Sequence, residues 1–245
     1  VYKRQIIYND INKLTIRMKN MTLSSLLNDE NFISPIIISL KVAVSATILS
    51  LISAILIHYL LSRKYFKGKT ILEAIIMLPM VLPPTVVGFL LLILFGKQSF
   101  MGKFIELLFH QPIIFTIYAA IAASTLVALP LMYQSIKIGI EQIPENLYHV
   151  AQLDGASKFR MFTHITLPLS KAALLTGTLL AFARAIGEFG ATLIFAGNIP
   201  GVTETMPTAI YVAIENNDLH LAYAWVFIMI VMSFFMMIAT QLLRK

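Results

Sequence analysis

IPENLYHVAQLDGASKFRMFTHITLPL, residues 143–169, is a polar stretch of mixed charge that lies between two strongly apolar segments. Pro144 and Glu145 are typical of a helix start, and Gly155 stops that helix after Asp154. Three apolar residues recur between these ends at helical spacing: Leu147, Val150 and Ala151. The stretch is therefore expected to begin with one short helix.

A second short helix is expected after the glycine. Ser157 is a residue type that caps helix starts, so we predict a helix from Ser157 through Phe162. The pair Leu167-Pro168 then turns the chain back toward the next apolar segment. Two helices around a glycine break make a compact projection, which on a membrane subunit indicates a protein partner. An ordinary amphipathic connector between spans is the alternative.

The composition of the whole chain is that of a polytopic membrane protein. Of its 245 residues 58% are hydrophobic and 13% are charged, and the mean hydropathy is +0.81, whereas soluble domains carry about 25% charged residues. The absence of cysteine excludes disulfides and cysteine-based metal or redox sites. The net charge of +7 is compatible with nucleic-acid binding, but we expect the excess Lys and Arg in loops that flank the membrane.

Five apolar segments are long enough to cross the hydrocarbon layer, which takes about 20 helical residues. We predict spans at Ile36–Leu61, Ile71–Phe95, Pro112–Ser135, Leu169–Phe195 and Ala222–Leu243. The sequence has no linker, low-complexity tract or internal repeat, so residues 34–245 are expected to form one transmembrane domain after an N-terminal segment, 1–33. The predicted fold class is an all-α polytopic membrane protein with about five transmembrane helices.

Basic residues predict the orientation of these spans, because they accumulate on the cytoplasmic side. The segments after the first and third spans are therefore expected inside, on the strength of Arg63, Lys64, Lys67, Lys69, Lys137, Lys158 and Arg160. Arg244-Lys245 place the C-terminus inside as well, which leaves 96–111 and 197–219 outside. His58, near the end of the first span, is expected to be an interfacial residue.

Residues 1–20 conflict with this orientation, because they are polar and basic yet would lie outside. They also lack the apolar core of a signal peptide. We therefore expect translation to begin at Met21, which would leave a short acidic leader that contains Asp29 and Glu30.

The chain is not expected to hydrolyse ATP or to be an enzyme. Gly68-Lys69-Thr70 matches the end of a phosphate-binding loop, but Arg63 stands where that motif needs its first glycine. An intramembrane enzyme, a rival class, would need paired intramembrane aspartates or a histidine-glutamate metal motif, and the sequence offers neither. We expect no cofactor and no metal site. Any ATP-driven activity would therefore require a partner subunit.

The second predicted span contains residues that interrupt a helix. Pro79, Pro83 and Pro84 remove backbone hydrogen bonds, and the freed carbonyls must be satisfied by neighbouring helices or a water-lined cavity. Gly88 follows on the same segment. We expect a kink in this span, with lining of a transport pathway as the alternative.

The fourth predicted span carries an ionisable pair. Arg184 and Glu188 are four residues apart on one predicted helical face, within reach of each other. Charged groups at such depth are functional candidates unless they form a structural ion pair, and both interpretations stay open. Small residues nearby allow close approach of helices or subunits: Gly187, Gly190 and Ala191.

The stretch 143–169 resembles the cytoplasmic loop of ABC-importer permeases, whose pattern is roughly E-A-A, three residues, Gly and then I-x-L-P. His149 stands where that family usually has its glutamate, which puts any contact through that carboxylate in doubt. The resemblance implies a coupling helix that docks into a groove of a separate ATP-hydrolysing subunit. The residues expected to make this coupling contact are Val150, Ala151, Asp154, Gly155, Ala156, Ile165, Leu167 and Pro168.

Two further stretches, LPMVLPPTVVGFLLL (78–92) and FARAIGEFGATLIFAGNIPGVTETMPTAIY (182–211), resemble permeases of oxyanion ABC importers, molybdate permeases more closely than sulfate/thiosulfate permeases. The resemblance implies a type I importer transmembrane domain, a homodimer of this subunit, two ATPase subunits and an extracytoplasmic binding protein that captures a tetrahedral dianion. Molybdate is the implied cargo, and tungstate or sulfate/thiosulfate is the alternative.

In this scheme closure of the ATPase dimer moves the spans. A short helix is expected at 208–215, within the segment 197–219. This segment either receives the binding protein or is a plain loop. The residues predicted for the pathway or gate are Pro83, Pro84, Arg184, Gly187, Glu188 and Gly190. Because Glu188 cancels much of the field of Arg184, selectivity is expected mainly in the binding protein. A secondary transporter is the rival class, and five spans without a repeat count against it.

Overall fold

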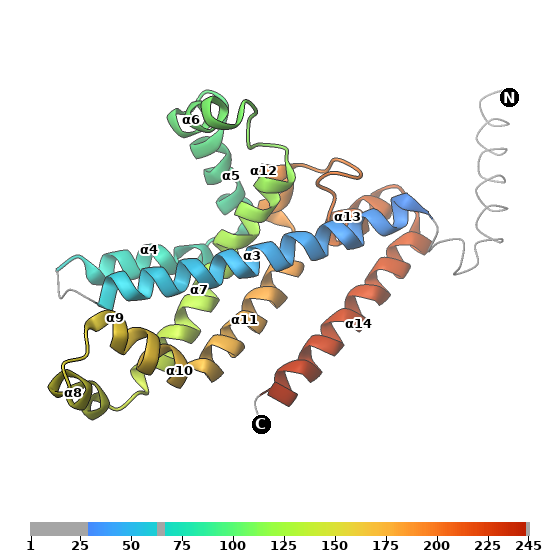
Figure 1. The fold of residues 1–245 in the computed structure, drawn as a ribbon. Coiled ribbons are helices and arrows are strands. Elements are labelled where there is room, and N and C mark those ends of the chain that lie inside the picture. The colour runs from blue at the N-terminus through green and yellow to red at the C-terminus, as the bar shows by residue number, and fades with distance from the viewer. Residues whose placement is uncertain (1–28, 63–66, 244–245) are drawn as a thin grey trace, which may run out of the picture.

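The computed structural model describes residues 29–62 and 67–243, and this part of the chain is all-helical (Figure 1). The predicted start at Met21, the basic residues of 1–20, Arg63-Lys64 and Arg244-Lys245 lie outside the described residues. The first described helix, α3, is Glu30–Ser62 and has 33 residues. It begins six residues before the predicted span, because Asp29 caps it through a hydrogen bond of 3.0 Å from the Asn31 amide to Asp29 Oδ1.

The second predicted span is not one kinked helix but is broken in two. This segment forms two helices, α4 (Lys69–Val81) and α5 (Pro84–Phe95), whose axes differ by 117°. A residue before proline is driven to extended backbone, and both Leu82 (ψ 143°) and Pro83 (ψ 136°) precede a proline and are extended. Two successive prolines therefore produce a sharp break where one proline would produce a kink.

The predicted outer loop 96–111 contains a helix, α6 (Phe100–Phe109). Ser99 caps its start, with the Gly102 amide 2.8 Å from Ser99 Oγ. Apolar side chains of α6 are exposed, among them Phe100, Phe104 and Leu107. The serine cap and the apolar spacing are local signals for this helix, and the prediction of a plain loop at 96–111 is wrong.

The central helix of the bundle is α7 (Ile117–Glu141), which packs along both α3 and α11 (Lys171–Ile186). It starts five residues later than predicted, at the cap Thr116, and ends six residues later. Small residues allow the close packing: Ala119, Ala120, Ala123, Ser124 and Ala128 are buried.

The predicted fourth span is also two helices. After α11 ends at Ile186, residues 187–189 leave helical geometry and α12 (Gly190–Ala196) follows. Glu188 therefore lies in the break and not on the same helix as Arg184. Gly187, which has no side chain, follows the last residue of α11. The chain then turns, and α12 packs against α5 and α7.

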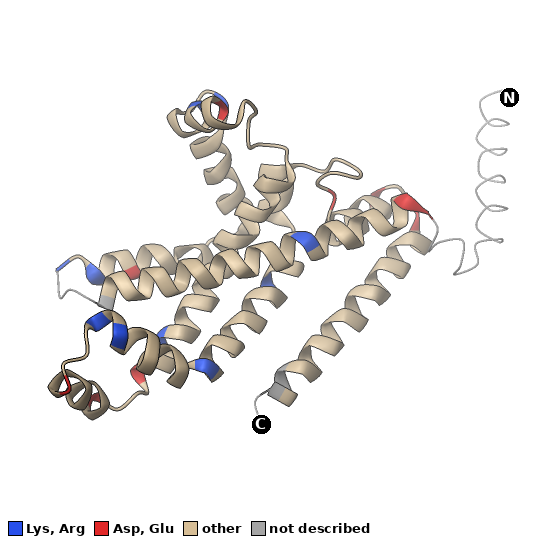
Figure 2. Ribbon diagram, in the orientation of Figure 1, with Lys and Arg blue, Asp and Glu red and all other residues tan. Residues whose placement is uncertain are grey.

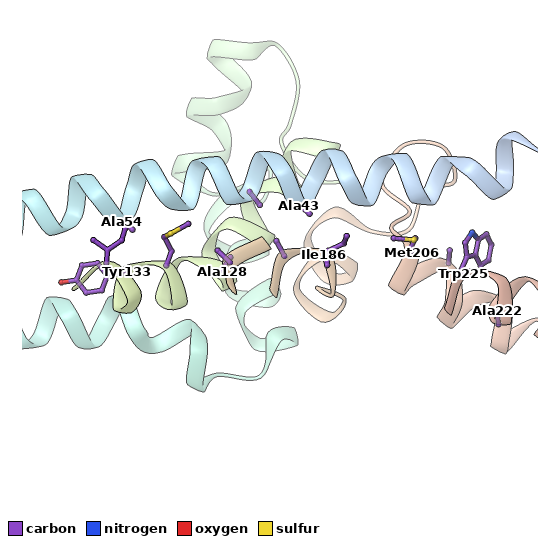
Figure 3. Close-up of a cluster of buried hydrophobic side chains, with 14 of the residues drawn as sticks. Ala43, Ala54, Ala128, Tyr133, Ile186, Met206, Ala222 and Trp225 are labelled. Atoms are coloured by element: carbon purple, nitrogen blue, oxygen red, sulfur yellow. The ribbon is translucent and has the colours of Figure 1, made fainter. Parts of the chain in front are cut away.

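The outer segment holds α13 (Met206–Glu215), which confirms the short helix expected there, and α14 (Leu219–Leu243) completes the bundle. Side-chain contacts fasten these helices to the start of α3. Trp225 Nε1 donates to the Phe32 carbonyl at 3.1 Å while the two rings stack at 5.7 Å, and the Met206 amide donates to Ser39 Oγ at 2.7 Å. Figure 3 shows this buried cluster extending along α3 from Ala54 to Trp225.

Among the described residues, three helices are each long and apolar enough to cross a membrane: α3, α7 and α14. The number rises to five if each of two bent pairs is one span, so five spans is the upper count. Figure 2 shows Lys and Arg gathered around α9 and the start of α4, together with Asp and Glu on α4 and α8, while the start of α3 at the opposite end carries Asp and Glu. This charge asymmetry is of the kind that orients membrane proteins with the basic end in the cytoplasm.

Candidate functional site

The projection between α7 and α11 begins with α8 (Glu145–Leu153), which confirms the predicted helix after Pro144. Gly155 ends it in the left-handed region, with φ +78°. The Gly155 amide donates to the Gln152 carbonyl at 3.0 Å, and the Ala156 amide donates to the Ala151 carbonyl at 2.9 Å. This pair of hydrogen bonds is a Schellman motif, which requires φ above zero at the glycine position.

The two faces of α8 differ, although the helix buries none of its residues. Glu145, Tyr148 and Gln152 line a pocket of about 450 Å³ against the ends of α3 and α7. The opposite face is apolar and points away from the bundle: Leu147 is 41% exposed, Val150 57% and Leu153 87%. A helix that presents apolar side chains at spacing i, i+3, i+6 outside its own fold is built to meet a partner.

The second half of the projection differs from the prediction at its end. Ser157 caps α9 (Lys158–Met161), with the Arg160 amide 3.3 Å from Ser157 Oγ, but the helix stops one residue before the predicted Phe162. A π-helical turn, η1 (Phe162–Thr166), and α10 (Leu167–Leu169) follow. Pro168 lacks an amide hydrogen, and the wider turn accommodates that missing hydrogen bond.

Side-chain contacts join the parts of the projection to each other and to the bundle. The hydroxyls of Tyr148 and Thr166 are 3.0 Å apart and join α8 to η1. The rings of Tyr59 on α3 and Phe162 on η1 lie 4.7 Å apart. The helix α8 is thus carried by a few specific contacts at one edge, an arrangement that allows it to move with a docked partner.

Two of the predicted gate residues, Pro84 and Gly190, meet where α12 packs against α5, helices that lie side by side in Figure 1. A Cβ on Gly190 would lie 3.2 Å from Pro84 Cβ and 3.1 Å from Thr85 Cγ2, so α12 begins directly against the proline break. One turn on, a Cβ on Gly88 would lie 2.8 Å from the Ala191 carbonyl oxygen. These glycines allow the backbones of α5 and α12 to touch. Gly187, by contrast, is exposed and has no close neighbour across this contact.

Arg184 and Glu188, whose spacing puts them within reach of each other, form an ion pair. Arg184 Nη1 lies 2.5 Å from Glu188 Oε2, and Glu188 Oε1 accepts a hydrogen bond of 2.8 Å from the Ala191 amide. The Glu188 side chain is 1% exposed and that of Arg184 is 31% exposed. The carboxylate therefore ties the end of α11 to the start of α12 across the break, and the buried charge is compensated.

The loop before α13 has its own polar network. Gly197 and Gly201 both have positive φ, and Thr203 Oγ1 accepts a hydrogen bond of 2.9 Å from the Ile199 amide. Burial raises the pKa of the Glu204 carboxyl, and a hydrogen bond with Asn198 opposes that shift in part. Within residues 29–62 and 67–243 no group of three His, Cys, Asp or Glu residues has the arrangement of a metal site.

Comparison with known proteins identifies the family to which this arrangement of helices belongs. The sequence pattern of the family described as "Binding-protein-dependent transport system inner membrane component" matches residues 46–245. The chain belongs to this family. It is therefore a multi-pass membrane component of a binding-protein-dependent ABC importer, which confirms the fold class that the sequence predicts.

Relatives of this transport component are found among named permeases. The chain is 52% identical over 219 residues to the YvgM protein of Bacillus subtilis (strain 168). The aligned residues make up 89% of this chain and 96% of the relative. It is 45% identical over 184 residues to the molybdenum transport system permease protein ModB of Haemophilus influenzae, with 75% and 80% covered.

The fold has a solved counterpart. A bacterial ABC transporter involved in the import of the acidic polysaccharide alginate matches with a TM-score of 0.72 and 18% identity, over 97% of this chain and 89% of that chain. At this identity the likeness concerns the arrangement of helices alone, and it agrees with the family assignment.

One cluster in this transport component has no local sequence signal. Lys137 Nζ on α7 lies 2.8 Å from Glu73 Oε2 on α4, and the Tyr133 hydroxyl donates to Glu73 Oε1 at 3.4 Å. Glu73 and Lys137 are 64 positions apart, so no periodicity of one segment indicates their contact. The sequence indicates Lys137 only as a basic residue that helps to set the topology, and it gives no sign that Glu73 is its partner.

Proposed function

We propose that the chain is the membrane-spanning permease subunit of an importer that carries molybdate into the cytoplasm, driven by a separate ATP-hydrolysing subunit. The observation that supports this proposal most is the exposed apolar face of α8. An apolar face that projects from the bundle in this way indicates a protein partner. The names of the relatives support molybdate as the cargo, with tungstate or sulfate/thiosulfate as the alternative.

We place the coupling contact on α8 and the turns that follow it. Val150 and Asp154 are exposed for docking, while Ala151, Gly155 and Ala156 form the Schellman turn that sets the angle of the helix. Ile165, Leu167 and Pro168 lie on the segment that leads from α8 into α11, where the chain bends by 70°. Displacement of α8 would therefore be transmitted to α11.

The assembly that we propose has two copies of this chain, two ATPase subunits and an extracytoplasmic binding protein. The basic end of the molecule, with the coupling loop and the C-terminus, faces the cytoplasm, and the segment 197–219 faces outward to receive the binding protein. This orientation is supported by the distribution of charge in Figure 2. The family description supports a binding protein as a partner.

Transport then follows from alternating access. Closure of the ATPase subunits draws the paired coupling helices together, and the contact between α5 and α12 changes as the inner side closes and the outer side opens. The binding protein delivers its anion, and ATP hydrolysis reopens the inner side. Pro83, Pro84, Gly187 and Gly190 flank the breaks at which this movement would occur.

Arg184 is paired with Glu188, so the two charges largely cancel and leave little field for a tight anion site. Selectivity is therefore assigned mainly to the binding protein. Arg184→Ala is expected to lower the rate of uptake while keeping the order of preference among oxyanions. A variant at this position that reversed the preference between molybdate and sulfate would overturn the assignment.

The cargo is tested by elemental analysis of molybdenum in cells with and without the chain, with sulfate as competitor. Uptake that depends on the chain and resists excess sulfate supports molybdate, and uptake that sulfate abolishes supports the alternative. Uptake that persists without ATP would support a secondary transporter instead.

The docking contact is tested by co-purification of the ATPase subunit. Leu153→Lys places a charge on the apolar face of α8 and is expected to abolish co-purification. Gln152→Lys is the matched control, because Gln152 is also exposed on α8 but lies on the other face, toward the pocket against α3 and α7. Loss of the ATPase in both variants, or in neither, would contradict docking through the apolar face.

A further inference from the structure

Lys137 lies between two carboxylates on different helices. Its Nζ is 2.8 Å from Glu73 Oε2 on α4 and 4.0 Å from Glu141 Oε1, one turn further along α7. The Tyr133 hydroxyl also donates to Glu73, at 3.4 Å from Oε1. One ammonium group thus has a partner across the helix interface and a second potential partner on its own helix.

The contact with Glu73 matters because α4 is loosely packed. None of the residues of α4 is buried, and Ile76 and Met77 are its half-buried apolar contacts with the main core cluster. Little apolar area therefore holds α4 on the bundle, and the ion pair is the strong directional contact between α4 and α7.

The position of the pair joins the two predicted functional regions. Lys137 and Glu141 lie in the last two turns of α7, directly before Ile143, which is buried where the coupling loop begins. At its other end α4 runs into the Leu82–Pro84 break, and that break contacts Gly190 on α12. Movement of the coupling loop can reach the gate by this route.

We propose that Lys137 is a positioning residue that couples the loop to the gate by exchanging partners. In the conformation described here it holds α4 through Glu73. When the end of α7 moves with the coupling loop, Lys137 releases Glu73 and pairs with Glu141, and α4 is free to reorient. This inference rests on the proposed transport function.

The geometry suits exchange, because Glu141 is at position i+4 from Lys137 and a side-chain rotation alone closes 4.0 Å to hydrogen-bond distance. The side chains are also not sealed from water: Lys137 is 32% exposed, Glu73 20% and Glu141 62%. Partly hydrated pairs form and break at small cost. Other titratable groups near the pair are His58 on α3 and Lys69 on α4.

The test uses the full complex in proteoliposomes, with ATP hydrolysis and molybdate uptake measured together. Glu73→Gln is expected to lower molybdate uptake per ATP by about fivefold, the effect of losing one partly exposed ion pair. The charge swap of Glu73→Lys with Lys137→Glu keeps an ion pair between α4 and α7 but places two carboxylates at positions 137 and 141, so it is expected not to restore the ratio. Glu106→Gln, an exposed carboxylate on α6, is the matched control and should keep the wild-type ratio.

A second measurement covers variants that assemble poorly. The sequence has no cysteine, so spin labels can be attached at Ala74→Cys on α4 and Ile138→Cys on α7, both exposed. Glu73→Gln is expected to broaden the distance distribution between the labels in detergent. An unchanged distribution, or an unchanged uptake ratio, overturns the exchange. If the wild-type complex shows no ATP-dependent uptake, the proposed function fails instead, and the label distances still test the tie between α4 and α7.

Discussion

Gly88→Ala tests the contact on which the proposed gate depends, the backbone-to-backbone approach of α5 and α12. The added methyl carbon would lie 2.8 Å from the Ala191 carbonyl oxygen, 2.9 Å from Ala191 Cα and 3.0 Å from Ile194 Cβ. Two of these three atoms are backbone, so a rotation of one side chain cannot relieve the overlap. The helices must separate instead.

The size of the effect follows from these distances. Carbon atoms in contact prefer about 3.5–4.0 Å, so the crossing has to open by several tenths of an ångström and up to about 1 Å. Overpacking of this kind costs about 1–3 kcal/mol. For a chain of this length the apparent Tm is expected to fall by roughly 3–10 °C.

The assay is thermal unfolding of the purified chain in detergent, followed by circular dichroism. Gly187→Ala is the matched control, because the nearest atom to its added carbon, the Ala183 carbonyl oxygen, is 3.6 Å away. A Gly88→Ala chain as stable as the wild type, or a Gly187→Ala chain destabilised to the same degree, would refute the close crossing of α5 and α12.

Three further predictions concern single side chains. Trp225→Phe keeps the ring stacking but loses the hydrogen bond to the Phe32 carbonyl, and it should lower the free energy of unfolding by about 1 kcal/mol, measured by thermal unfolding. Tyr148→Phe removes the hydroxyl contact with Thr166 and should speed hydrogen exchange of α8 by about fivefold, without change in α7. Burial raises the pKa of the Glu204 carboxyl, so the folded chain favours its protonated form. The contribution of Glu204 to stability should therefore fall as the pH rises from its unfolded pKa through its folded pKa. Glu204→Gln should remove that part of the pH dependence of Tm.

The sequence predicted best where a local signal sets local structure. Gly155 and Ser157 mark the end of α8 and the start of α9, and both act as their residue types require. The i, i+4 spacing of Arg184 and Glu188 put them within reach of each other, and they pair even though the helix ends between them. Such signals need only the chemistry of a few neighbouring residues.

Prediction failed where the answer depends on tertiary packing. The residues Leu82-Pro83-Pro84 predict a helix interruption. The angle of 117° between α4 and α5, however, is set by the contact of α5 with α12, a contact between segments about 100 positions apart. The same holds for Glu73 and Lys137, whose ion pair joins two helices. Hydropathy gives the lengths of apolar segments, and it does not distinguish one span from two short helices in series.

The central claim is that this permease chain moves its anion only when a separate ATP-hydrolysing subunit acts on the projection at 143–169. The most direct measurement is molybdate uptake into proteoliposomes that contain the chain and its binding protein, with and without the ATPase subunit. The account predicts uptake only when the ATPase subunit and ATP are both present. Uptake at the full rate by the chain without an ATPase subunit would contradict it.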